Sequence, residues 1–347
     1  MTDRCLSIRQ HKLLFYQIFY LISIKSGKEV KMMRRGRFAP TPSGKMHLGN
    51  ARTALLSWLH MRSLGGEFIL RMEDIDTARS RKEWAELALT DLRWLGLDWD
   101  EGPDIGGPYA PYTQSERLER YEAAFRQLEA KGSLYPCYCS RADILAAVSA
   151  PHGLSSEGPA YAGTCRHLTP AERATRGLHK EPSLRFALPE GQEVIFTDGI
   201  AGPQTFPPGS GGDFVIRRAD GLYSYQLSVV VDDADMLITD VLRGSDLLDS
   251  TPRQILLCEA LGLEIPEFLH VPLLNGPDGK RLAKRHGGIA ISAHRESGTP
   301  PERLVGWLAY VSGLIDRPQP VSASELIDSF DLALIPREPI VVDVPHI

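Results

Sequence analysis

The chain has 347 residues, which is long enough for two or three structural units and a substantial core. Its composition is that of an ordinary globular protein, and its net charge of −5 does not indicate a nucleic-acid binder, although a local basic patch could still contact phosphates. Five irregularly placed cysteines argue against a disulfide scaffold, so we expect a reducing, cytoplasmic compartment.

Residues 1–33 differ from the rest of the chain. Leu13–Ile24 is an apolar run that is too short to span a bilayer, and no suitable cleavage site for a secretory signal follows it. We therefore expect an extension without chemistry and no association with a membrane. If translation starts at Met32 or Met33, the residues before it are a mis-assigned extension.

The segment after this extension alternates between strand and helix patterns. We predict strands at Gly36–Ala39 and Phe68–Met72 and helices at Ala51–Leu64 and Lys82–Leu95. A strand–helix–strand order predicts a parallel unit whose site lies at the carboxyl ends of the strands.

A further helix is predicted after Thr113–Glu116, which has the sequence of a capping box. Its expected apolar face consists of Leu118, Tyr121, Phe125 and Leu128. Gly132 is expected to end this helix.

From about Tyr135 to Phe206 the pattern changes to short strand-like pieces, such as Ser183–Ala187 and Glu193–Phe196, between glycines and prolines. We interpret this segment as an insertion between the two halves of a nucleotide-binding fold.

Beyond the insertion, Asp213–Arg217 and Leu222–Leu227 flank an Asp-Gly turn and predict a β-hairpin. Leu237–Leu242 is predicted to be a buried strand. After about residue 255 we expect mainly helix up to residue 314, followed by a proline-rich tail.

Together these patterns predict an α/β fold with a parallel sheet, an inserted subdomain and a helical C-terminal region. The expected units are an N-terminal extension (1–33), a first half of the catalytic domain (34–134), the insertion (135–206), a second half (207–260) and a C-terminal region (261–347).

The stretch Arg37–Asn50 joins the first strand to the first helix through a loop rich in proline and glycine. Backbone N–H groups and the positive helix end would point at an anion such as an ATP phosphate, and Gly44 and Gly49 would allow a close approach. His47 could donate a hydrogen bond to a phosphate. The alternative interpretation is a helix-capping loop with a surface histidine.

Charged side chains follow several of the predicted strands. Glu73 could hold an ammonium group, unless its acidic neighbourhood is only a solvated cluster at a turn. Arg243 offers a bidentate fork for a carboxylate, and Arg37 is a second cation. Tyr225 could simply pack in the core.

Gly279–His286 is a basic segment late in the chain. A resemblance to the KMSKS loop of class I aminoacyl-tRNA synthetases implies that its Lys284 neutralises a triphosphate as pyrophosphate leaves. The segment alone could equally be a basic surface loop.

Three cysteines of the insertion are candidate ligands of a structural Zn²⁺, namely Cys137, Cys139 and Cys165. A fourth ligand is needed, and from chemistry alone His152 or His167 would be the usual choice. The alternative is that the cysteines pack as small apolar groups, which is our interpretation of Cys258.

These motifs, in this order from about residue 35 to residue 286, resemble the catalytic core of the class I glutamyl-tRNA synthetases. His47–Asn50 resembles the HIGH box, Arg71–Arg79 resembles an acidic motif of the glutamyl and glutaminyl enzymes, and Arg281–Arg285 resembles the KMSKS loop. The resemblance implies a Rossmann-like sheet and activation of L-glutamate by ATP with Mg²⁺. Arginine and alanine replace the first lysine and the serine of KMSKS, so we expect reduced speed rather than inactivity.

The resemblance also implies roles for individual residues. The implied glutamate-binding residues are Arg37, Phe38, Ala39, Pro40, Thr41, Glu73, Tyr225 and Arg243. The implied ATP-binding residues are His47, Gly49, Asn50 and Lys284, of which His47 and Lys284 are catalytic. One Zn²⁺ per chain is implied on Cys137, Cys139, Tyr161 and Cys165. A pocket with two guanidinium groups would penalise glutamine, whose amide leaves positive charge uncompensated.

Only about 60 residues follow His286, too few for the helical anticodon-binding domains of a full glutamyl enzyme. Together with the cysteine pattern, this resembles the glutamyl-Q tRNA(Asp) synthetase family. Its members activate glutamate without tRNA and esterify it to queuosine at the wobble position of tRNA(Asp). We therefore expect a monomer that binds the tRNA(Asp) anticodon loop, with the basic run Arg34–Arg37 and the insertion as candidate RNA contacts.

Two alternatives stay open from the sequence. The chain could be a truncated synthetase that charges the 3′ end of tRNA(Glu). It could also be a catalytically silent paralogue that only binds RNA or a protein partner, which the altered KMSKS-like segment would favour.

Overall fold

The computed structural model describes residues 33–147, 161–282 and 290–343. The chain divides into Met1–Met33 and Arg34–Ile347, and every described element belongs to the second of these units. The expected extension 1–33 therefore lies outside the described residues, apart from Met33.

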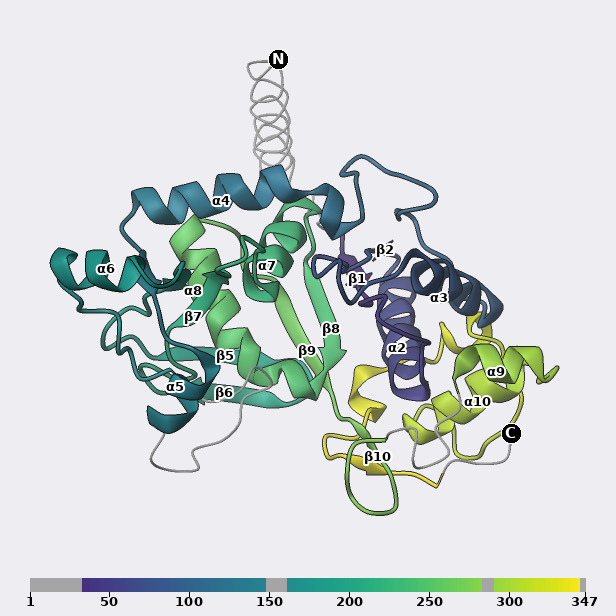
Figure 1. Ribbon diagram of the computed structural model, residues 1–347. Coiled ribbons are helices and arrows are strands. Elements are labelled where there is room, and N and C mark those ends of the chain that lie inside the picture. The colour runs from purple at the N-terminus through teal and green to yellow at the C-terminus, as the bar shows by residue number, and fades with distance from the viewer. Residues whose placement is uncertain (1–32, 148–160, 283–289, 344–347) are drawn as a thin grey trace, which may run out of the picture. The chain divides into compact units, whose positions relative to one another are not determined.

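A four-stranded parallel sheet forms the centre of this unit (Figure 1). Its strands are β1 (Arg35–Phe38), β2 (Glu67–Leu70), β8 (Asp240–Gly244) and β9 (Glu267–Val271), in the spatial order β2–β1–β8–β9. All pairings within the sheet are parallel. The predicted parallel unit is confirmed, because β1 and β2 pair directly and α2 (Leu48–Ser63) connects them.

One face of the sheet is apolar and packs on α2. Phe38, Phe68 and Leu70 are buried on this face together with side chains of α2. Because successive side chains of a strand point to opposite faces, the residues between them face the other layer. Helices α3 (Lys82–Trp94), α9 (Ile291–Glu296) and α10 (Pro301–Val311) complete the layer of α2.

The opposite face packs on helices from both sides of the predicted insertion. These helices are α4 (Leu118–Ala130), α7 (Tyr225–Asp235) and α8 (Thr251–Leu261). Ile69 of β2 and Val241 of β8 are buried with them. The two halves of the fold, which are far apart in sequence, thus share one core.

The predicted insertion folds around two small antiparallel sheets. The first contains β3 (Leu134–Cys137), β4 (Ser183–Phe186) and β7 (Phe214–Arg217), and the second contains β5 (Val194–Asp198) and β6 (Gly202–Phe206). Strand β7 hydrogen-bonds to β4 and therefore belongs to the sheet of the insertion. The insertion predicted from the sequence ended at residue 206, which placed this strand in the second half of the catalytic domain.

The remaining elements are short. They are the helices α5 (Arg141–Ala147) and α6 (Pro170–Gly177), the strands β10 (Leu274–Asn275) and β11 (Ile340–Val341), and 3₁₀ turns at Gln114–Glu116, Ser245–Ser250, Ser324–Leu326 and Leu332–Leu334. None of the helices in the described part of the chain combines the length and apolar character that crossing a bilayer requires.

The capping box predicted at Thr113–Glu116 is wrong. Thr113 pairs with Met72 in an extended bridge, so its side chain caps nothing, and α4 begins only at Leu118. A reciprocal capping box occurs instead at α6, between Thr169 and Glu172. Leu118 is 47% exposed, whereas the other predicted members of the apolar face of α4 are buried.

The second arm of the predicted hairpin is also wrong. The Ser224 hydroxyl accepts a hydrogen bond from the backbone N–H of Leu227, and this cap starts α7 at Tyr225. A single bridge between Arg217 and Tyr223 is all that remains of the second arm.

Two differences concern the second half of the sheet. The strand predicted at Leu237–Leu242 begins later, at Asp240, because Leu237 has a positive φ of 55°. Strand β9 contradicts the expectation of mainly helix after residue 255.

Two arginines of the basic run Arg34–Arg37 are buried and so do not form the expected RNA-contacting surface. Arg35 and Arg37 are only 8% and 4% exposed. The Arg35 guanidinium contacts Glu101, and Arg34 donates to Asp240. Arg35 and Arg37 are thus enclosed in the fold, whereas the Arg34 side chain stays 27% exposed while it pairs with Asp240.

Candidate active site

A pocket of about 770 Å³ lies at the carboxyl ends of β1 and β8, beside the start of α2. The sequence-predicted residues that line it are Arg37, Phe38, Ala39, Pro40, Thr41, His47, Gly49, Asn50, Glu73, Tyr225 and Arg243. The structure therefore brings together every described residue to which the sequence assigned glutamate or ATP, while their individual roles stay predictions.

The loop after β1 is fixed by backbone hydrogen bonds from the segment after β2. The N–H of Arg71 donates to the Phe38 carbonyl at 3.1 Å, and the N–H of Glu73 donates to the Pro40 carbonyl at 3.0 Å. His47 is the N-cap residue of α2, and its side chain makes no cap hydrogen bond. The first turn of α2 thus presents backbone N–H groups at the edge of the pocket, a favourable environment for an anion.

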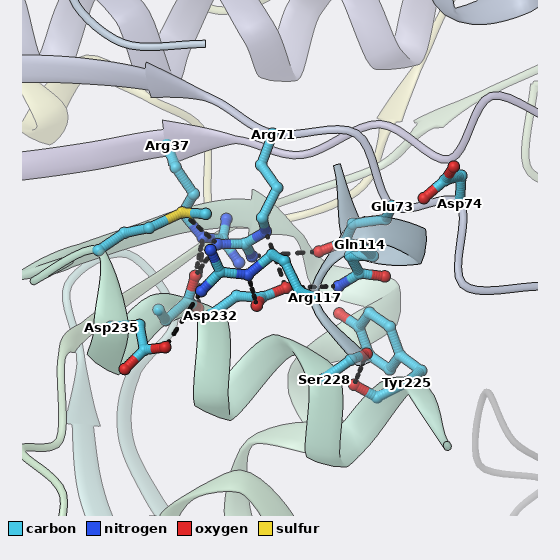
Figure 2. Close-up of polar contacts among 12 residues, drawn as sticks. Arg37, Arg71, Glu73, Asp74, Gln114, Arg117, Tyr225, Ser228, Asp232 and Asp235 are labelled. Atoms are coloured by element: carbon cyan, nitrogen blue, oxygen red, sulfur yellow. Dashed lines mark hydrogen bonds and ion pairs between the residues drawn. The ribbon is translucent and has the colours of Figure 1, made fainter. Parts of the chain in front are cut away.

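A buried ion network connects β1 and β2 to α7. Asp233 of α7 accepts hydrogen bonds from Arg37 Nε at 3.2 Å and pairs with Arg71 Nη1 at 2.8 Å. Arg71 Nη2 in turn donates to Glu73 at 3.1 Å. Figure 2 shows the two arginines reaching from the strands towards the carboxylates of the helix. Burial opposes the charged form of Asp233, but both guanidinium groups outweigh it and lower the pKa of this carboxyl.

The neighbouring Asp232 anchors α4 to the same place. It accepts hydrogen bonds from Arg117 Nε at 2.6 Å, from Gln114 Nε2 at 2.9 Å and from the Tyr121 hydroxyl. None of these side chains is more than 1% exposed. The two buried carboxylates of α7 are therefore neutralised by arginines that approach from different elements. These ion pairs fix the position of α7, which begins with Tyr225.

Glu73 is the buried carboxylate of the pocket. Burial raises its pKa, and Arg71 and Arg37 only partly offset this effect. Its carboxylate accepts a hydrogen bond from Arg71 Nη2. A cationic ligand group beside Glu73 would favour its charged form.

Arg243 is held on two sides and lines the pocket. Its Nε donates to His270 Nε2 at 2.9 Å and its Nη2 donates to Thr251 Oγ1 at 2.9 Å. Its Nη1 is buried without a hydrogen-bond partner. Burial lowers the pKa of Arg243, and no carboxylate among the described residues forms an ion pair with it. An acidic ligand would supply the missing charge.

Arg52 is a pocket residue that the sequence analysis did not assign. It is 1% exposed, with its Nε bonded to Ser312 Oγ at 2.9 Å and its Nη1 to the Pro272 carbonyl at 2.6 Å. Its Nη2 has no partner, and burial alone lowers its pKa to about 10. The signal that could have identified it is a charged residue at an inward-facing position of an apolar helix.

Part of the KMSKS-like segment also reaches the pocket. Arg281 and Leu282 line it, and Arg281 Nη1 donates to Asp246 at 2.6 Å. The backbone N–H of Leu282 donates to the Leu274 carbonyl, which fixes the start of the segment. The predicted catalytic Lys284 lies outside the described residues.

The insertion holds a separate cluster of sulfur atoms. The Sγ atoms of Cys137, Cys139 and Cys165 lie within 4.8 Å of one another. The Tyr161 hydroxyl lies 3.4 Å and 3.6 Å from the first two of these Sγ atoms. Gly212 lets the backbone of Tyr161 pack closely, because a Cβ there would lie 2.6 Å from its carbonyl oxygen.

Several residues of the site received no role from the sequence. Arg71, Asp232 and Asp233 pair although more than 160 positions separate the arginine from the aspartates, and no local pattern signals this. His270 was missed together with its strand β9. Arginine and aspartate at positions that otherwise read as buried would have been the signal to look for.

A family model described as "tRNA synthetases class I (E and Q), catalytic domain" matches residues 33–343. The chain is 68% identical over 306 residues to the glutamyl-Q tRNA(Asp) synthetase of Symbiobacterium thermophilum, covering 88% of this chain and 94% of that protein. It is 47% identical to the protein of the same name from Nitratidesulfovibrio vulgaris, covering 89% and 95%.

The chain is also similar to longer synthetases. It is 43% identical to the glutamate–tRNA ligase of Symbiobacterium thermophilum, covering 90% of this chain and 66% of that protein. The crystal structure of the glutamate–tRNA synthetase of Elizabethkingia anophelis superimposes with a TM-score of 0.78 at 32% identity, covering 89% of this chain and 68% of that one.

Replacing Asp233 by alanine should destabilise the fold by about 3–5 kcal/mol, because Arg37 and Arg71 would keep their buried charges without this carboxylate. Urea unfolding would measure the change. The matched control is Glu86→Ala, which removes the exposed pair with Lys82 and should cost less than about 0.5 kcal/mol. Equal losses in the two variants would contradict a structural role for the network.

Proposed function

Because the chain belongs to the class I tRNA synthetases of the glutamyl and glutaminyl type, and within them to the glutamyl-Q tRNA(Asp) synthetases, we propose that it uses ATP to activate L-glutamate and transfers the glutamyl group to queuosine of tRNA(Asp). The observation that carries the proposal is the 68% identity over nearly the whole length of such a relative. The pocket that gathers Arg37, Glu73 and Arg243 supports it independently.

In this proposal the pocket recognises glutamate by charge. The guanidinium of Arg243, which lacks a carboxylate partner among the described residues, receives one carboxylate of the substrate. Arg37 provides a second positive charge, and Glu73 accepts the α-ammonium group. Tyr225 closes the pocket from the start of α7.

ATP binds at the start of α2 in this proposal. Class I synthetases use ATP with Mg²⁺, which supplies positive charge at the phosphates. The α-carboxylate of glutamate attacks the α-phosphorus, a mixed anhydride forms and pyrophosphate leaves. His47 donates a hydrogen bond to the phosphate oxygens as charge develops there, and Gly49 and Asn50 present the helix end. Lys284 would neutralise the departing pyrophosphate.

The second step transfers the glutamyl group to RNA. A hydroxyl of the queuosine cyclopentenediol attacks the carbonyl carbon of the anhydride, and AMP leaves with the bonding electrons. We propose that the anticodon loop of tRNA(Asp) carries this hydroxyl into the pocket. The carboxyl ends of the strands, where the pocket opens, are the position at which parallel sheets bind ligands.

The main alternative is charging of the 3′ end of tRNA(Glu). The chain resembles a glutamate–tRNA ligase as well, and one organism carries both relatives. Its identity to the glutamyl-Q protein of Symbiobacterium thermophilum is 68%, against 43% to the ligase of the same organism. This difference favours the glutamyl-Q activity over ligase activity.

The acceptor is tested by incubating the enzyme with labelled glutamate, ATP and purified tRNA. We expect acid-precipitable label on tRNA(Asp) that carries queuosine, and none on tRNA(Asp) that lacks it or on tRNA(Glu). Label on tRNA(Glu) would support the ligase alternative. Pyrophosphate exchange without any dependence on glutamate would contradict both activities.

Replacing Arg243 by alanine should raise the KM for glutamate by about 100-fold or more in ATP–pyrophosphate exchange, because a desolvated charge partner of the substrate is lost. The KM for ATP should change little. Arg126→Ala, at an exposed arginine of α4 paired with Glu122 and Glu129, is the matched control. An unchanged KM for glutamate in Arg243→Ala would refute the assignment.

We also propose one structural Zn²⁺ in the insertion. Tetrahedral Zn²⁺ with bonds of about 2.3 Å to sulfur requires its sulfur ligands about 3.8 Å apart. The Sγ atoms of Cys139 and Cys165 lie 3.6 Å apart. Tyr161 lies inside the cluster and fits as the fourth ligand, whereas His167 is exposed and His152 lies outside the described residues.

The purified protein should contain about one zinc per chain by elemental analysis, and Cys165→Ser should lose it because three ligands bind too weakly. Cys258→Ala, at a buried cysteine outside the cluster, should retain the metal. Tyr161→Phe tests the fourth ligand separately. A wild-type protein prepared without chelators and still free of zinc would refute the proposal.

A further inference from the structure

We propose that His270 and Asp198 are positioning residues that hold Arg243 in the orientation in which it receives the substrate carboxylate. This inference rests on the proposed function, since it concerns how the glutamate pocket is kept ready. Neither residue lines the pocket. Their effect on glutamate therefore has to pass through Arg243.

We call the chain of contacts from Asp198 through His270 to Arg243 the relay, and its members come from three segments of the chain. Arg243 of β8 and His270 of β9 are direct partners in the parallel register, so their side chains leave the sheet on the same face. Arg243 Nε donates to His270 Nε2 at 2.9 Å, and His270 Nδ1 lies 2.6 Å from Asp198 Oδ2. Asp198 is the last residue of β5, so the relay runs from the insertion to the pocket.

The chemistry of the three groups fixes the direction of both hydrogen bonds. An arginine side chain only donates, so His270 Nε2 must accept. The imidazole proton is then on Nδ1 and is donated to Asp198. Burial lowers the pKa of His270 to about 4, and the Asp198 contact offsets only part of this effect. The imidazole is therefore neutral near pH 7 and remains an acceptor for Arg243.

Asp198 is itself rigidly held. Its Oδ1 accepts from the backbone N–H groups of Ile200, Ala201 and His270 at 3.0, 2.8 and 3.0 Å. Its Oδ2 therefore faces the imidazole. A carboxylate is required here, because it accepts on both oxygens at once.

The relay determines which nitrogen of Arg243 is left for the substrate. His270 occupies Nε, and Thr251 occupies Nη2. Nη1 remains buried without a partner. Without the acceptor at His270, the guanidinium would turn to satisfy Nε, and the orientation of Nη1 would be lost.

A matched pair of variants separates positioning from packing. The amide of asparagine can take the place of His270 Nδ1 and still donate to Asp198, but it leaves Arg243 Nε without an acceptor. The amide oxygen of glutamine can reach the place of Nε2 and accept from Arg243. We expect His270→Asn to raise the KM for glutamate about tenfold or more in ATP–pyrophosphate exchange, and His270→Gln by less than about threefold. The KM for ATP should stay within about twofold in both.

Asp198→Asn tests the relay from outside the pocket and covers the case in which His270→Asn fails to fold. Because three backbone N–H groups require the amide oxygen at the Oδ1 position, the amide NH₂ would face Nδ1. The imidazole would then carry its proton on Nε2, and this N–H would face the Nε–H donor of Arg243. We expect a raised KM for glutamate and a changed imidazole tautomer by ¹⁵N NMR.

Two results would overturn the inference. One is an unchanged KM for glutamate in both His270→Asn and Asp198→Asn, and the other is an equal rise of the KM values for glutamate and ATP in His270→Asn and His270→Gln. Failure of the proposed function looks different, since the wild-type protein would then show no glutamate-dependent exchange at all.

Discussion

The ion network between Arg37, Arg71 and Asp233 is the interaction on which the rest of the molecule depends. Arg37 and Arg71 belong to the chain before the insertion, and Asp233 belongs to the chain after it. Their pairing joins the two halves of the catalytic domain at the point where the pocket forms. Because these charges are buried, separating them would leave each half with an uncompensated charge, so the pocket exists only when both halves are docked.

The alternation of side chains along the parallel strands explains how a site of this charge fits into an apolar core. Phe38 faces the α2 layer, whereas Arg37 faces the α7 layer, and Leu242 and Arg243 divide in the same way. Arg37 and Arg243 therefore leave the sheet on one face, near the carboxyl ends of their strands. There the helices α7 and α8 supply acceptors, and the substrate is proposed to supply the missing carboxylates.

The sequence located the residues of the pocket better than the helices and strands that carry them. Residues such as His47, Glu73 and Arg243 follow strands or open a helix, so local patterns locate them. Strand β9 was not predicted, because its five residues include a histidine and a glutamate and show little alternation of apolar and polar side chains. Ser224 was read as part of a strand because the Asp-Gly turn before it predicts a β-hairpin, whereas its hydroxyl caps α7. The Asp198–His270 contact joins residues 72 positions apart, and no local pattern encodes such a pairing.

The anchoring of Arg52 has a consequence for synthesis of the protein. This arginine belongs to the first helix of the catalytic domain, yet its partners lie 220 and 260 positions later, at Pro272 and Ser312. On the ribosome the emerging helix cannot bury this side chain until almost the entire polypeptide has left the exit tunnel. Completion of the pocket is thus a late event, and a prematurely terminated product would lack the finished pocket even though it contains the residues at the start of α2.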